Sequence, residues 1–167
     1  MGKGLEIREF LPGDSYVATL YDAQSTHFVQ SDAASGQLQV MITHADYTTK
    51  EAYRGLRTLH SRMQALSYVL PPVSFWAVDY QTWCSNHTGQ FCPANRTQVK
   101  AFLQAYPHYK ADVKFDAHGV VASRMVASLE LPTDMPGRLI VMRSSREACA
   151  NLPGGVGAIA FEWGFLW

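Results

Sequence analysis

The sequence lacks any excess of charge and any long apolar run. Its 167 residues carry 14 Lys and Arg against 14 Asp and Glu, so the formal net charge is zero. A nucleic-acid binder normally has a basic surface, and this balance argues against that class. No apolar stretch approaches the roughly 20 residues of a transmembrane helix, and the start, MGKGLEIREF, lacks the apolar centre of a signal peptide. These features alone predict a cytosolic protein.

The sequence also lacks a recognisable catalytic or metal-binding pattern. Its six histidines are scattered singly, without an i, i+4 pair, and no Cys-x-x-Cys occurs. The acidic residues show no spacing typical of acid–base catalysis. Cys149 lies within an apolar helical pattern, so we interpret it as a small buried side chain and not as a nucleophile. We therefore expect no enzymatic activity, no metal and no cofactor.

Only three cysteines are present, and two of them bracket a short polar loop. The sequon at Asn86 lies between Cys84 and Cys92, and a second sequon begins at Asn95. This combination favours an oxidising, secretory compartment, in which we expect a Cys84–Cys92 disulfide and glycans at both asparagines. The alternative is a polar surface loop with two unpaired thiols. Asn95 is also a candidate N-cap, a role that competes with a glycan for the same amide.

Hydrophobic periodicity predicts a mixed succession of strands and helices. Strands are expected at 36–44, in a hairpin over 113–131 that turns at 116–119, and at the aromatic end 158–167. The stretch 73–84 is ambiguous and is consistent with a short strand followed by a helical turn. Helices are expected at 11–28, 47–66, 95–106 and 135–152. In the second helix, Thr48 and Glu51 should form a capping box, while Arg54, Arg57 and Arg62 should face solvent.

This order of elements predicts an α+β fold. It repeats a split β-α-β unit twice, which is the ferredoxin-like sandwich pattern. We expect one domain over residues 1–167, with a helical or loop insertion at about 80–109 and a leading segment at 1–30. The odd positions of the last strand are large and apolar. We therefore expect Ile159 and Phe161 in the sheet–helix core with Met125, Leu56, Leu59 and Leu139.

Four stretches carry a resemblance to a known family. They are Leu11-Pro12-Gly13-Asp14-Ser15 with Phe28; Phe75-Trp76 with Asp79-Tyr80; Tyr109, Asp112, Val113 and Phe115 with Ala122-Ser123-Arg124; and MRSSREACANL with FEWGFLW. In this order they resemble the second large extracellular or lumenal domain of Patched-related and Niemann–Pick type C-like proteins. The resemblance covers nearly the whole chain, and it implies a leading segment that is membrane-proximal.

The resemblance implies a part of a membrane protein of the resistance–nodulation–division superfamily that moves or senses sterols or other lipids. The domain would lie outside the cell or in an organelle lumen and would contact the other extracellular domain of its parent. The aromatic end would then lie at a membrane interface, where aromatic residues are enriched. The isolated domain would bind lipid only weakly, because it supplies half of the conduit.

Four aromatic residues in or beside the insertion are the candidates for lipid or partner contact: Phe75, Trp76, Tyr80 and Trp83. Exposed apolar patches mark such surfaces. The alternative is that these side chains pack the insertion onto the sheet. The competing functions are a self-contained ferredoxin-like ligand-binding domain or enzyme, and an RNA- or protein-binding module, which the neutral charge disfavours.

Overall fold

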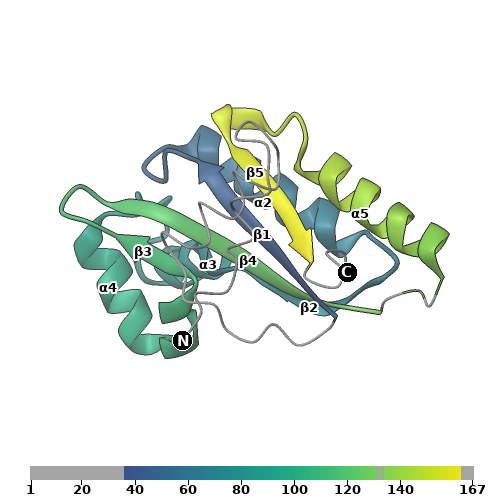
Figure 1. The fold of residues 1–167 in the computed structure, drawn as a ribbon. Helices are drawn as coiled ribbons and strands as arrows, with labels where there is room; N and C mark the ends of the chain where they lie inside the picture. Colours follow the sequence, from purple (N-terminus) through teal and green to yellow (C-terminus); the bar gives the residue numbers. More distant parts are fainter. Residues whose placement is uncertain (1–35, 131, 133, 163–167) are drawn as a thin grey trace, which may run out of the picture.

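The computed structural model describes residues 36–130, 132 and 134–162 (Figure 1). The elements in chain order are β1 (Gln37–His44), α2 (Lys50–Gln64), β2 (Val69–Ser74), α3 (Trp76–Thr88), α4 (Arg96–Ala105), η2 (Pro107–Ala111), β3 (Val113–Phe115), β4 (Val120–Leu129), α5 (Met135–Cys149), η3 (Pro153–Gly155) and β5 (Gly157–Glu162). The expected helix at 11–28, the segment 1–30 and the end of the aromatic strand, 163–167, lie outside the described residues. Within the described ranges, no helix combines the length and apolarity that crossing a bilayer requires.

The described strands form an antiparallel sheet in the order β2-β4-β1-β5, with β3 also paired to β4. Strand β4 is antiparallel to both β1 and β2, so β1 and β2 run parallel with β4 between them. In the same way β4 and β5 run parallel on either side of β1. Helix α2 connects the first parallel pair and α5 the second. The expectation of an α+β fold is confirmed at this level.

One face of the sheet is covered by the helices and forms the main core. Leu38 and Val40 of β1 and Met125 of β4 pack there with Leu56 and Leu59 of α2. Figure 1 shows α2 behind the strands, α5 at one side of the molecule and α4 at the other. The insertion thus extends this layer of helices along the sheet.

Strand β1 is buried on both faces. Gln39 and Met41 point away from the helices, yet they are only 2% and 3% exposed. On this second face Met41 and Ala122 form a smaller apolar cluster. The strand is central in the sheet, so burial on both sides is consistent with its place.

The face assignment of β5 was wrong. Ala158 and Ala160 pack with the main core, whereas Ile159 and Phe161 pack on the second-face cluster. Helix α5 lies against β5. The small alanine side chains allow the helix to approach the strand closely, as the dense packing of a protein interior requires. Leu139 was also misplaced, because it is 56% exposed on α5.

Helix α2 follows the predicted apolar stripe but begins differently. Ala52 and Met63 are buried with the two core leucines of this helix. The N-cap is Thr49, whose hydroxyl accepts a hydrogen bond from the Ala52 N–H at 3.2 Å. The expected Thr48–Glu51 capping box is therefore wrong by one residue, since Thr48 instead donates its hydroxyl hydrogen to Asp46 Oδ1 at 2.6 Å.

Arg62 does more than face solvent. Its Nη1 donates hydrogen bonds to the carbonyl oxygens of Ala148 and Ala150, at 3.3 and 2.7 Å. These carbonyls lie at the C-terminal end of α5, where backbone acceptors lack helical partners. Arg62 thus joins α2 to the end of α5, while Arg54 and Arg57 are exposed as expected.

Candidate functional site

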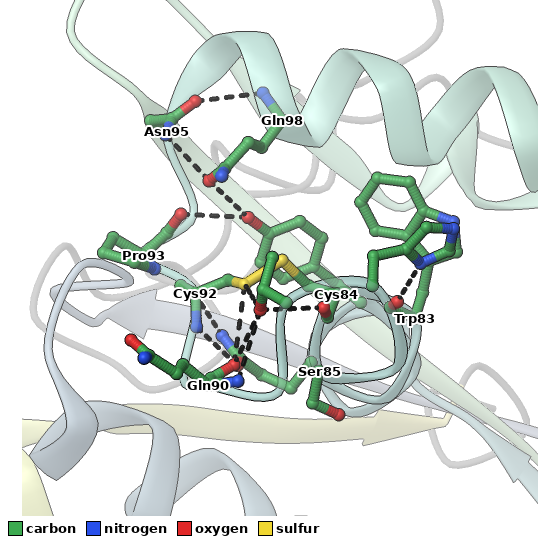
Figure 2. The surroundings of a disulfide bond; sticks show 12 residues. Trp83, Cys84, Ser85, Gln90, Cys92, Pro93, Asn95 and Gln98 are labelled. Atoms are coloured by element: carbon green, nitrogen blue, oxygen red, sulfur yellow. Dashed lines mark hydrogen bonds between the residues drawn. A yellow bond between two sulfur atoms is a disulfide. The ribbon is translucent and has the colours of Figure 1, made fainter.

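The predicted disulfide between Cys84 and Cys92 is present (Figure 2). Its Cα atoms are 6.2 Å apart, and it ties the last turn of α3 to the segment that leads into α4. The buried side chain of Gln81 reinforces this link: its Oε1 accepts from the Cys92 N–H at 3.2 Å and its Nε2 donates to the Cys92 carbonyl. Sequence analysis missed Gln81, because a single glutamine on a helix gives no signal of its own.

The two sequons lie in different local structures. Asn86 is exposed near the end of α3. Asn95 is the N-cap of α4, as predicted: its Oδ1 accepts from the Gln98 N–H at 2.9 Å, and its Nδ2 donates to Gln98 Oε1 at 2.8 Å. Figure 2 shows Asn95 and Gln98 facing each other across the first turn of α4. Glycosylation at either position stays a prediction.

The aromatic candidates do not form the exposed patch that was expected. Phe75, Trp76 and Tyr80 are buried, with 1%, 0% and 1% exposure. Trp83 alone of the four is half-buried, and its ring lies 5.8 Å from that of Phe102, centroid to centroid. The alternative interpretation therefore holds for the first three: they pack the insertion onto the sheet.

The aromatic cluster encloses very little space. A cavity of about 10 Å³ lies among Tyr47, Trp76 and Tyr80, which is room for about one water molecule and none for a sterol. The Tyr80 hydroxyl is the donor to two nearby acceptors, the Pro93 carbonyl oxygen at 2.9 Å and Gln98 Oε1 at 3.1 Å. Burial raises the pKa of Tyr80 to about 12, so this hydroxyl stays protonated and holds the disulfide loop against α4.

A second tyrosine joins α3 to the segment before β3. The buried Tyr109 donates its hydroxyl hydrogen to the Asp79 carboxylate, and Ser74 Oγ donates to the Tyr109 oxygen at 3.2 Å. Burial first, and then the hydrogen bond to Asp79, raise the pKa of Tyr109 well above its usual value. A phenol held protonated in this way does not serve as a general base near neutral pH.

The two parts of the third stretch of the resemblance, around Asp112 and around Arg124, lie side by side in the structure. Val113 pairs with Ser123 across the β3–β4 ladder, and Arg124 Nε lies 2.7 Å from Asp112 Oδ1. Sequence alone did not indicate this ion pair. Among the described residues, no three His, Cys, Asp or Glu side chains come close enough together to hold a metal ion.

Comparison with known proteins gives no assignment. No family model matches the chain, and no curated protein sequence matches it.

Proposed function

We propose that this chain is an extracellular or lumenal domain of a Patched-related or Niemann–Pick type C-like membrane protein that moves or senses sterols or other lipids. The observation that carries the proposal is the ion pair between Asp112 and Arg124. Both residues belong to the third stretch of the resemblance, and their contact supplies a physical reason for Asp112 and Arg124 to occur together in it. The Cys84–Cys92 disulfide fits the extracellular or lumenal location.

The strand order supports the finer proposal of a ferredoxin-like fold. Each of α2 and α5 joins two parallel strands that have a third strand between them, which is the split β-α-β arrangement of that fold. Helices α3 and α4 would then be an insertion into the connection between β2 and β4. Its extent is wider than the expected 80–109, because α3 begins at Trp76 and η2 ends at Ala111.

In this proposal the domain forms one wall of a lipid conduit and catalyses no reaction. The aromatic cluster of the insertion is filled by its own side chains, so the lipid would pass along the surface facing the other extracellular domain. Of the four aromatic candidates, Trp83 keeps this role, because it is the one that is only half-buried.

The first experiment is to sequence the full transcript from which this chain derives. The proposal requires apolar segments of roughly 20 residues on both sides of the domain. A stop codon directly after Trp167, together with an upstream region free of such a segment, overturns it.

The second experiment measures fluorescent cholesterol transfer by the full-length parent in vesicles. Trp83→Ala should slow transfer, and Trp83→Phe, which keeps an aromatic ring, should restore most of it. The isolated domain should show no saturable cholesterol binding, because half of the conduit is absent. Unchanged transfer by a folded Trp83→Ala variant removes Trp83 from the conduit, and saturable binding to the isolated domain contradicts the shared wall.

A further inference from the structure

An open groove runs between helix α4 and strand β3, away from the aromatic cluster. It has a volume of about 540 Å³, within the range of ligand sites. Leu103, Val113 and the half-buried Phe115 supply its apolar lining, and Lys100 and Lys110 supply charge on the α4 and η2 sides. Figure 1 shows α4 beside β3 at one end of the molecule.

Phe115 is flanked by cations. The guanidinium carbon of Arg96 lies 6.0 Å from the ring centroid and Lys100 Nζ lies 5.9 Å from it, distances at which the ring quadrupole attracts a cation. These two groups place two positive charges beside one apolar ring, and Lys110 adds a third positive charge to the groove that the ring lines. The whole chain has no net charge, so this is a local concentration of positive charge.

No carboxylate among the described residues forms an ion pair with these three cations. The nearby Asp112 is paired with Arg124. Asp116 accepts the backbone N–H groups of His118 and Gly119 in the hairpin turn, and these hydrogen bonds lower its pKa. The charge around the groove is therefore available to a ligand.

The positions of Arg96 and Lys100 are unfavourable for the stability of helix α4 itself. Arg96 is the first residue of the helix, where the helix dipole disfavours positive charge. Arg96 and Lys100 are also like charges at i, i+4, which destabilise a helix. The helix contains no acidic residue to offset either effect. Violations of local rules are expected at functional sites.

We infer that this groove binds an acidic segment of a partner protein in which carboxylates flank one apolar side chain. The apolar side chain lies on Phe115 and Leu103, and the carboxylates reach Lys100 and Lys110 on opposite walls. A lipid with one anionic headgroup uses only part of this charge. A flat anionic membrane does not fill a concave groove, whereas a peptide segment does. Clusters of basic residues recognise acidic motifs in this way.

The test uses fluorescence anisotropy with the intact 167-residue chain in its disulfide form. The probe is a labelled peptide with three acidic residues on each side of one phenylalanine. The double variant Lys100→Glu/Lys110→Glu should weaken binding about tenfold or more, equivalent to about 1.4 kcal/mol. A peptide with alanine in place of the phenylalanine should also bind more weakly.

The matched control is Arg54→Glu/Arg57→Glu, which makes the same change in net charge at exposed positions on α2. It should leave the affinity within about twofold, because neither arginine lines the groove and exposed charges are screened by salt. Circular dichroism should show both variants folded. Three results overturn the inference: no binding by the wild type, equal weakening by both double variants, or Lys100-dependent binding to phosphatidylserine vesicles without binding to the peptide.

Discussion

Arg124 and Asp112 form an ion pair that links three strands. Arg124 Nε lies 2.7 Å from Asp112 Oδ1, and the two side chains are only 10% and 14% exposed. The Arg124 backbone N–H donates to the Asp112 carbonyl at 2.9 Å, and Nη1 donates to Gln39 Oε1 of β1 at 3.4 Å. One arginine on β4 thus reaches both the start of β3 and the central strand.

Asp112→Asn should destabilise the domain by about 3–5 kcal/mol, because it removes one member of an ion pair whose two side chains are largely buried. Urea denaturation of the purified chain measures this loss. The control is Glu147→Gln, which breaks the exposed Arg143–Glu147 pair and should change stability by less than about 1 kcal/mol. Equal losses in the two variants would contradict a special role for the Asp112–Arg124 pair.

Trp76→Ala should reduce stability by about 3–5 kcal/mol, since it empties a fully buried site. Trp76→Phe should lose clearly less. It keeps a ring in the cluster and removes the Trp76 Nε1–H, a buried donor that has no hydrogen-bond partner among the described residues. Thermal and urea unfolding give both values. A Trp76→Ala loss no larger than that of half-buried Trp83→Ala would mean that α3 packs less tightly than described.

The sequence predicted well the features that depend on local spacing. The apolar stripe of α2, the Asn95 cap and the hairpin turn closed by Gly119, with φ of +147°, all follow from short-range rules. The Cys84–Cys92 disulfide follows from two thiols near each other in sequence and the neighbouring sequons.

Features that depend on which surfaces meet could not be predicted in the same way. The alternation in β5 defined two faces of the strand but did not show which of them the helices cover. The helices cover the face that carries Ala160, because α5 packs closely against it. The exposure of Trp76 was misjudged because the count of aromatic residues does not show that α3 and α4 bury one another's side chains. Arg96 and Lys100 are neighbours on α4, but Phe115 and Lys110 come near them only through the packing of β3 and η2 beside α4.

Gly154→Ala should destabilise the domain far more than Gly155→Ala. Both glycines have positive φ, +70° and +66°, so each alanine pays the left-handed backbone penalty of about 1–2 kcal/mol. A Cβ on Gly154 would also lie 2.1 Å from the Glu51 carbonyl oxygen of α2, whereas one on Gly155 meets nothing within 4 Å. Urea midpoints of the two variants isolate this clash, and matching midpoints would show that α2 and η3 are not in close contact.

Cys149 should make the domain less stable as the pH rises above about 9. Burial raises the pKa of its thiol from 9.0 to about 12 in the folded state. The unfolded thiol therefore ionises first, so its contribution is complete below pH 9 and is lost as the pH approaches 12. Between about pH 8 and pH 10 we expect a loss of about 1 kcal/mol beyond that of Cys149→Ala. If the free energy of unfolding, measured by urea titration, falls equally with pH in the two proteins, the burial of this thiol is contradicted.

Asn86 should carry more glycan than Asn95 when the chain is expressed through a secretory pathway. The Asn86 side chain is exposed, whereas both amide atoms of Asn95 are engaged with Gln98 at the start of α4. Asn86→Gln should therefore abolish most of the mass shift removed by a peptide N-glycosidase, and Asn95→Gln should abolish little of it.

In unglycosylated protein, substitution of Asn95 should have the larger effect on stability. Asn95→Ala should cost about 1 kcal/mol by removing the cap, and Asn86→Ala should cost less than about 0.5 kcal/mol. A fully occupied Asn95 in a protein as stable as the unglycosylated chain would show that the cap and the glycan do not compete.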